Sequence, residues 1–158
     1  MTRVLLTGAT GYIGSHTWVA LAAAGFEVVG ADHFGNSSPK VLDRLEELSG
    51  ARPEFERIDV CDRAAVDAVF GRHAPDAVIH FAALKAVGES VEQPLAYYRN
   101  NVGGLVNVCD ALQQHGVRRF VFSSSATVYG DPEQLPITES ARLTATNPYG
   151  QTKLIGET

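Results

Sequence analysis

Gly8-Ala9-Thr10-Gly11-Tyr12-Ile13-Gly14 is the stretch that decides the fold of this chain. It follows a short apolar run, residues 3–7, and it opens a helical pattern over residues 13–24. A tight turn at this point needs residues without Cβ, and so does the close approach of a backbone to a pyrophosphate. The amide groups at the start of the helix would then face the anion. The stretch therefore predicts a nucleotide-binding turn between a strand and a helix.

An acidic residue at the right distance supports the same interpretation. Asp32 closes the expected second strand, 18 residues beyond Gly14. A carboxylate there can accept hydrogen bonds from ribose hydroxyls and would repel a 2′-phosphate. No Arg or Lys follows Asp32 before Lys40, so NAD is favoured over NADP. An alternative interpretation is that the glycines form only a turn and that Asp32 is a solvated acidic residue of a loop. We disfavour this interpretation because the strand, the glycines, the helix and the acidic residue occur in the expected order.

Short apolar runs alternate with longer helical patterns along the whole chain. The expected strands are residues 3–7, 27–31, 54–59, 77–81 and 118–123, and the expected helices are residues 13–24, 39–48, 63–71 and 94–114. Consecutive apolar residues, as in Phe120-Val121-Phe122, are typical of parallel strands covered on both faces. The alternation predicts right-handed crossovers and an α/β fold. We expect a doubly wound, Rossmann-like parallel sheet of about five strands with helices on both faces.

Residues at the expected helix ends agree with this division. Gly25 and Gly116 lie just past two helices, where a left-handed residue is needed. Asp62 fits the N-cap of the third helix, and Pro94 fits the first turn of the fourth.

The fourth helix carries an apolar pattern and two glycines. Helical spacing predicts one buried stripe, formed by Leu95, Tyr98, Val102, Leu105, Cys109 and Leu112. Gly103 and Gly104 should each weaken this helix by about 1 kcal/mol relative to Ala. Close packing would explain them, and a tolerated defect is an equal alternative.

Composition bounds the class of protein. The chain has 158 residues, of which 45% are apolar, enough for one core. A net charge of −5 without a basic block argues against a nucleic-acid or anionic-membrane partner. Cys61 and Cys109 predict free thiols in a reducing compartment, and the histidines show no ligand spacing, so we expect no metal. The absence of a signal-peptide layout and of an apolar span favours the cytoplasm.

A serine, a tyrosine and a lysine suggest acid–base chemistry. Ser123-Ser124-Ser125 ends the fifth strand, at the edge where open α/β sheets bind ligands. Tyr149 and Lys153 are four residues apart, one turn of a helix. A nearby ammonium favours phenolate over phenol, and a serine hydroxyl can hold a substrate oxygen and relay its proton. Alone, this spacing would indicate a packing tyrosine and a solvated lysine. Beside the nucleotide turn, it predicts removal of a hydroxyl proton while hydride leaves the same carbon.

Two longer stretches carry a resemblance to a known family. Residues 78–90 read VIHFAALKAVGES and residues 122–131 read FSSSATVYGD. With the residues above, they resemble the UDP-galactose 4-epimerase family of the extended short-chain dehydrogenase/reductase superfamily, essentially along the whole chain from Arg3. The resemblance implies that Ser125, Tyr149 and Lys153 are catalytic, and that Lys85, Ser125 and Tyr149 contact a UDP-sugar substrate. It also implies transient oxidation of the sugar at C4 by a resident NAD.

The resemblance and the nucleotide turn together give a set of expected NAD contacts. These are Gly8, Gly11, Tyr12, Ile13, Gly14, Asp32, Asn36, Ser37, Asp59, Val60, Phe81, Ala82, Ala83, Lys85, Asn100, Tyr149 and Lys153. Ala83 stands where the family often has Gly.

Several of these positions have a simpler interpretation without the family. Asp59 and Val60 could equally end the third strand, and Asn100 could equally be a solvated helix residue. Lys85 would more readily be a surface charge. His80 fits a hydrogen-bonded core histidine better than a catalyst.

Three rival functions follow from the resemblance. A nucleotide-sugar dehydratase usually has an Asp-Glu pair after the fifth strand, where this chain has Ala126-Thr127. A 4-epimerase for another nucleotide sugar is harder to separate, because sugar selection depends mostly on later residues of the family. The third rival is a non-catalytic NAD-binding fragment. Family members continue into a substrate domain and often form homodimers, so residues 1–158 are expected to be the amino-terminal, NAD-binding part of a longer parent.

Overall fold

The computed structural model describes all residues from Met1 to Thr158. Five parallel strands form one sheet in the order β3-β2-β1-β4-β5. They are β1 Arg3–Thr7, β2 Glu27–Asp32, β3 Glu54–Arg57, β4 Ala77–His80 and β5 Arg119–Phe122. The predicted α/β fold, with a parallel sheet of about five strands, is confirmed, although β3 ends two residues earlier than expected.

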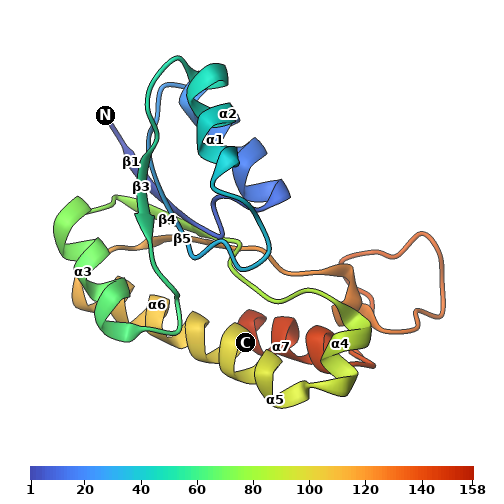
Figure 1. Cartoon of the computed structure of the whole chain (residues 1–158). Coiled ribbons are helices and arrows are strands. Elements are labelled where there is room, and N and C mark those ends of the chain that lie inside the picture. The colour runs from blue at the N-terminus through green and yellow to red at the C-terminus, as the bar shows by residue number, and fades with distance from the viewer.

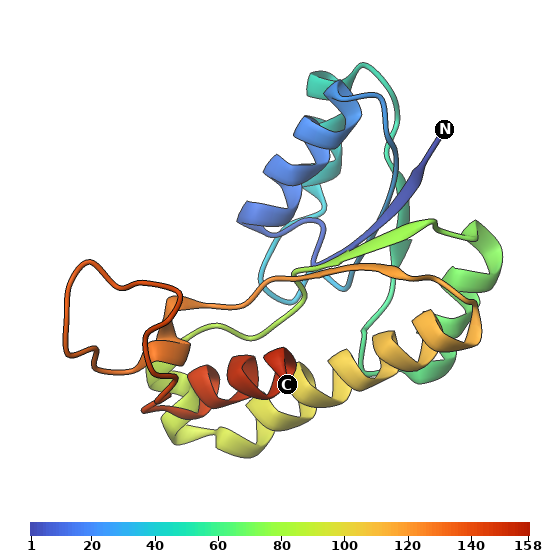
Figure 2. The same cartoon turned by 180° about the vertical axis from the view of Figure 1, so that it is seen from behind.

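Helices cover both faces of the sheet, as Figures 1 and 2 show from opposite sides. They are α1 Tyr12–Ala23, α2 Lys40–Ser49, α3 Arg63–His73, α4 Val87–Glu92, α5 Pro94–Tyr97, α6 Gly104–Gln114 and α7 Pro148–Glu157. A π-helix, η1 Tyr98–Gly103, joins α5 to α6, and a 3-10 turn, η2 Ala126–Tyr129, follows β5. The helices α1 and α2 lie on one face, and α3, α6 and α7 lie on the other (Figure 1). None of them combines the length and the apolar character that a bilayer crossing requires.

The core consists of one apolar cluster on each face of the sheet. Alternate residues of β1 point to opposite faces, so Val4 and Leu6 pack with Trp18 of α1, whereas Leu5 packs with Phe70 of α3. Gly30 of β2 makes room for the indole, because a Cβ there would lie 2.0 Å from the Trp18 ring. The strands are therefore buried on both sides, as their apolar sequences indicate.

The predicted helix ends are confirmed. Gly25 and Gly116 adopt φ of 83° and 69°. The Asp62 carboxylate accepts a hydrogen bond from Ala65 N, and Pro94 begins α5.

The expected single helix over residues 94–114 is instead three segments, and its predicted stripe is partly wrong. Leu95 is 66% exposed and Cys109 is also exposed. The buried face instead passes through Tyr97, Asn101 and Val108. Tyr97 and Asn101, the polar members of this face, are buried because they form hydrogen bonds with the loop that follows β4.

The paired glycines of this region have different surroundings. A Cβ on Gly104 would lie 2.7 Å from Val60 Cγ2, so close packing explains this glycine. A Cβ on Gly103 would meet nothing within 4 Å. The predicted close packing is therefore confirmed for Gly104 only.

Candidate active site

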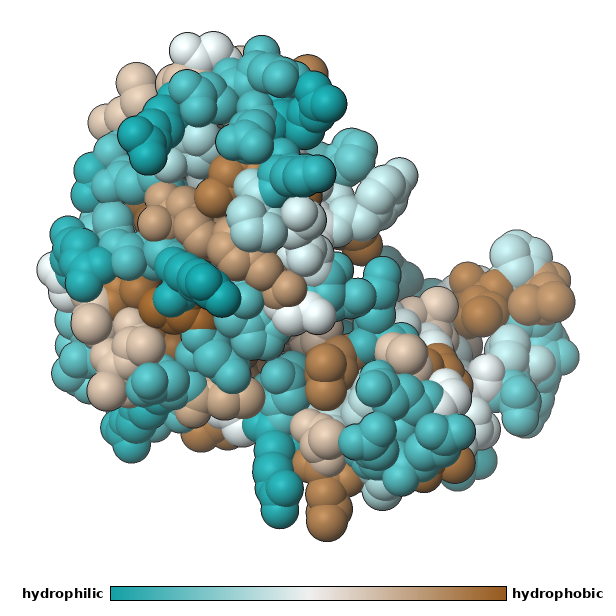
Figure 3. Space-filling model, viewed as in Figure 1, coloured by the Kyte–Doolittle hydropathy of each residue, from teal (hydrophilic) through white to brown (hydrophobic).

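The functional residues gather at the carboxyl edge of the sheet. The strand order reverses between β1 and β4, and ligands of open α/β sheets bind outside such a switch point. A cavity of about 600 Å³ opens there. Figure 3 shows the surface hollowed between the part covered by α1 and α2 and the protruding segment that follows β5.

The cavity lining contains every residue that the sequence predicts for the site. It is formed by Gly8, Gly11, Tyr12, Ile13, Gly14, Asp32, Asn36, Ser37, Asp59, Val60, Phe81, Ala82, Ala83, Lys85, Asn100, Ser125, Tyr149 and Lys153, together with seven others. The additional residues are Ala31, His33, Gly35, Ile58, Leu84, Ser123 and Ser124. Six of these are directly next to a predicted residue in the sequence, and Ser123 is two positions from Ser125. This adjacency is the signal that could have found them.

The glycine turn is packed directly against the loop after β4. Gly8 has φ of 69°, and a Cβ there would lie 2.6 Å from Ala82 N. A Cβ on Gly14 would lie 2.2 Å from Gly8 O, so the start of α1 is pressed onto the turn. Gly11 precedes α1 without a side-chain cap, which leaves amide groups of the first helical turn free. This arrangement fits the pyrophosphate of a dinucleotide.

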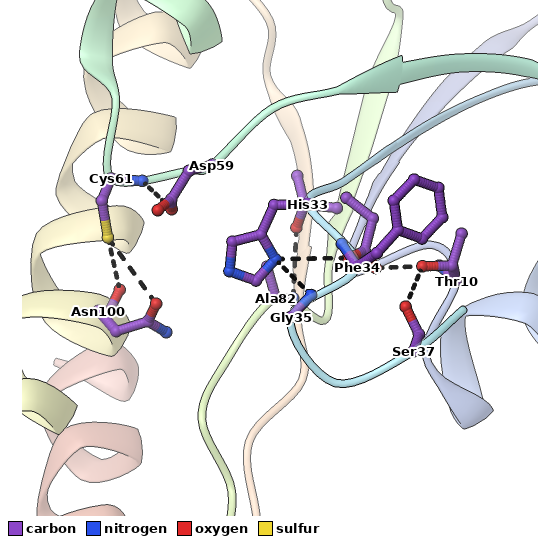
Figure 4. Close-up of polar contacts among 11 residues, drawn as sticks. Thr10, His33, Phe34, Gly35, Ser37, Asp59, Cys61, Ala82 and Asn100 are labelled. Carbon is purple, nitrogen blue, oxygen red and sulfur yellow. Dashed lines mark hydrogen bonds and ion pairs between the residues drawn. The ribbon is translucent and has the colours of Figure 1, made fainter. Parts of the chain in front are cut away.

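Asp32 ends β2, and its side chain lies beside the glycine turn. Its carboxylate accepts hydrogen bonds from Thr10 N at 3.1 Å and from Phe34 N at 2.9 Å. Figure 4 shows this side of the cavity, where the Thr10 and Ser37 hydroxyls meet at 2.6 Å. Arg57 pairs with Asp32 in the strand register but stacks over Phe34, outside the cavity lining.

A second polar cluster closes the cavity beside η1. Asp59 accepts a hydrogen bond from Cys61 N at 2.9 Å, and the Cys61 thiol lies 3.8 Å from Asn100 Oδ1 (Figure 4). Partial desolvation, with a contribution from the Asp59 carboxylate, raises the pKa of the Cys61 thiol to about 11. The thiol therefore stays protonated near neutral pH. Asn107 Nδ2 donates to the carbonyls of Val60 and Cys61, which ties this loop to α6.

Asn101 connects three parts of the site. Leu84 N donates to Asn101 Oδ1 at 2.8 Å, and Asn101 Nδ2 donates to Leu84 O at 2.9 Å. Asn101 Nδ2 also lies 3.0 Å from Thr152 Oγ1 of α7. The neighbouring Asn100 lines the cavity instead. Both asparagines belong to η1, and single π-turns are frequent at functional sites.

Tyr97 makes a similar pair of contacts two residues farther along the same loop. Its hydroxyl accepts from Ala86 N at 3.0 Å and lies 2.8 Å from Ala86 O and 2.7 Å from Glu89 Oε2. Burial, followed by the Glu89 carboxylate, raises the pKa of Tyr97 to about 12. Lys85 lies between the two anchored residues, Leu84 and Ala86, so its backbone is held from both sides.

Lys153 is buried at the centre of the predicted catalytic group. Its Nζ donates to Ser123 O at 2.8 Å and lies 4.9 Å from the centre of the Phe122 ring. Burial lowers the pKa of Lys153 to about 8. Asn147 caps α7 by accepting from Gly150 N at 2.8 Å. The cap fixes the start of the helix that carries Tyr149 and Lys153. Because Lys153 is buried, the alternative of a solvated lysine is wrong.

His80 is a core residue, as predicted. Its ring is 1% exposed, its Nδ1 lies 2.6 Å from Thr7 Oγ1, and it stacks on Phe122 with ring centres 6.1 Å apart. Burial, with a smaller contribution from Lys153, lowers the pKa of His80 to about 3, so the imidazole is neutral. No three His, Cys, Asp or Glu side chains lie close enough together to hold a metal ion.

Comparisons with known proteins give a consistent result. Residues 4–158 match the profile of the family described as "NAD dependent epimerase/dehydratase family". The chain is 55% identical to UDP-glucose 4-epimerase of Bacillus subtilis, over 98% of this chain and 45% of that protein. It is 46% identical to the crystal structure of the Bifidobacterium longum UDP-glucose 4-epimerase in complex with NAD+ and UDP, with a TM-score of 0.96. That similarity covers 99% of this chain and 47% of the other.

A third similar protein is named for a second sugar as well. The UDP-Glc/GlcNAc 4-epimerase of Campylobacter jejuni is 36% identical, with a TM-score of 0.94, over 99% of this chain and 47% of that one. The chain thus spans about half the length of the curated relatives that it matches.

Proposed function

This chain belongs to the NAD dependent epimerase/dehydratase family, and we propose that it binds NAD in the cavity at the carboxyl edge of its sheet. The observation that carries the proposal is the lining of that cavity, which unites the glycine turn, Asp32 and the serine, tyrosine and lysine. These groups come from four separate regions of the sequence. Residues 1–158 would then form the NAD-binding domain.

The residues present fit this cofactor. The uncapped amides after Gly11 would hold the pyrophosphate, and the Asp32 carboxylate would accept hydrogen bonds from the adenosine ribose. Lys153 would reach the nicotinamide ribose from beneath the cavity.

We propose further that the complete protein interconverts UDP-galactose and UDP-glucose. When bound, NAD supplies the acceptor, and then the donor, of a hydride at C4 of the sugar. Tyr149 takes the proton of the 4-hydroxyl, and Ser125 binds the same oxygen. The similarity to proteins named UDP-glucose 4-epimerase supports this choice of sugars.

The residues after β5 favour epimerisation over dehydration. Dehydration needs acidic and basic groups to remove water from the sugar. Here Ser125 is followed by Ala126 and Thr127, and the next carboxylate in the sequence is Asp131. Asp131 lies outside the cavity lining.

The surroundings of the site suggest two further features of the complete protein. Leu95 of α5, Val106 of α6 and Ile155 of α7 are exposed apolar residues, which supports a homodimer formed through these helices. The exposed thiols of Cys61 and Cys109 suit a reducing compartment such as the cytoplasm.

The proposal is tested by incubating the complete protein with NAD and UDP-galactose and separating the products by chromatography. We expect UDP-glucose to form, and Tyr149→Phe to lose roughly 10²- to 10⁴-fold in rate. Tyr98→Phe is the matched control, because Tyr98 lies outside the cavity lining and should keep its rate. Full activity of Tyr149→Phe would refute the assigned base. Conversion of UDP-N-acetylglucosamine alone would assign the site to another nucleotide sugar.

A further inference from the structure

The Ser125 hydroxyl is held by a single neighbouring residue. Ser125 Oγ accepts a hydrogen bond from Thr127 N at 3.2 Å and another from Thr127 Oγ1 at 2.9 Å. Ser125 lines the cavity, whereas Thr127 does not. Thr127 therefore contacts the serine from the side that faces away from the proposed ligands.

These two contacts fix what the serine can still do. A hydroxyl group has one proton to donate and two lone pairs that accept. Thr127 occupies both lone pairs of Ser125 Oγ, so only the serine proton is left for a group in the cavity. Ser125 is thus prepared to donate a hydrogen bond and is poorly able to accept one.

The position of Thr127 is itself set by α7. A Cβ on Gly150 would lie 2.9 Å from Thr127 O and 3.3 Å from Thr127 Oγ1, so η2 packs tightly on the first turn of α7. Thr127 O also accepts from Gly130 N at 3.2 Å. Gly150 directly follows Tyr149, and the same contact therefore fixes both the serine and the tyrosine.

We propose that Thr127 is a positioning residue that fixes the direction of the Ser125 hydroxyl, an inference that rests on the proposed function. Ser125 keeps its proton and donates it as a hydrogen bond to the oxygen on C4. The O–H bond of the sugar hydroxyl breaks, and its proton goes directly to the Tyr149 oxygen. The hydride from C4 passes to NAD, and the C4=O bond forms. Ser125 thus stabilises the carbonyl oxygen without relaying the proton.

The direct test is a neutron crystal structure of the complete protein after exchange into deuterium oxide. We expect the Thr127 deuterium to point at Ser125 Oγ, and the Ser125 deuterium to point into the cavity. A Ser125 deuterium directed at Thr127 Oγ1 would overturn the inference. This outcome does not depend on the sugar. Failure of the wild type to interconvert the two UDP-sugars would refute the proposed function alone.

Kinetics test the consequence with matched variants. Thr127→Val should lower kcat about tenfold, with KM for the sugar within about twofold, because orientation of one donor is lost and the donor itself remains. Thr127→Ser should restore kcat, and Thr138→Val, in the exposed loop, should leave it unchanged. In a Ser125→Ala background, Thr127→Val should cause no further loss. An equal loss in both backgrounds would show that Thr127 does not act through Ser125.

Discussion

Replacing Gly8 by alanine tests whether close backbone approach shapes the nucleotide turn. At Gly8, φ is 69°, and an added Cβ would lie 2.6 Å from Ala82 N and 2.8 Å from Phe81 C. Gly25, at the other end of α1, supplies a matched control. Its φ is 83°, and an added Cβ would meet nothing within 4 Å.

The two glycines allow the cost of crowding to be separated from the cost of conformation. A left-handed backbone costs a residue with Cβ about 1–2 kcal/mol, and this applies to both positions. The lower entropy of the unfolded chain offsets about 0.4–1 kcal/mol, again in both. Only Gly8→Ala adds crowding against backbone atoms, which typically costs about 1–3 kcal/mol. The unfolding free energy of Gly8→Ala should therefore be lower by about 1–3 kcal/mol than that of Gly25→Ala.

Urea denaturation followed by circular dichroism measures both variants under the same conditions. We expect equal slopes and a lower midpoint for Gly8→Ala. Calorimetric titration should also show that Gly8→Ala weakens NAD binding at least tenfold, whereas Gly25→Ala binds as the wild type does. Equal unfolding free energies for the two variants would refute the argument from close approach.

Three further predictions concern Lys153, the paired glycines Gly103 and Gly104, and Asp32. Lys153 should titrate near pH 8 in a side-chain NMR experiment, and a midpoint at 10.5 would contradict its burial. Because the unfolded chain keeps this proton up to about 10.5, burying the charged lysine costs free energy below pH 8, and this cost is relieved as pH rises between those values, so the unfolding free energy increases with pH there. Gly103→Ala should raise the unfolding free energy by about 0.5–1 kcal/mol, whereas Gly104→Ala should lower it through contact with Val60, and urea midpoints shifted in the same direction would contradict this. Asp32→Asn should reduce the preference for NAD over NADP at least tenfold in titration calorimetry, and an unchanged ratio would show that another group selects the nucleotide.

Much of the fold and site can be predicted because the relevant signals are local. The glycine turn, Asp32 and the apolar runs each act within a few residues, and the parallel sheet brings their carboxyl ends together. Lys153 belongs to this group, since α7 places it one turn after Tyr149, as the four-residue spacing indicates.

The region around residues 94–114 could not be predicted because its contacts are distant in the sequence. Asn101 is buried and forms hydrogen bonds with Leu84 and Thr152. A prediction from the spacing of apolar residues assigns only apolar residues to the buried face, so it misses Asn101. The helix α4 has only 6 residues, which is shorter than the window over which hydrophobic periodicity can be read, so periodicity alone misses it. The direction of the Ser125–Thr127 hydrogen bond is local, but only atomic geometry reveals it.

The proposal of reversible oxidation at C4 is tested most directly with a labelled substrate. The complete protein would be incubated in ordinary water with NAD and UDP-galactose deuterated at C4, and the product analysed by NMR and mass spectrometry. Reversible oxidation by a resident NAD predicts UDP-glucose that retains its deuterium at C4, because the hydride returns to the carbon that it left. Absence of UDP-glucose, or a product with hydrogen from the solvent at C4, would contradict the account.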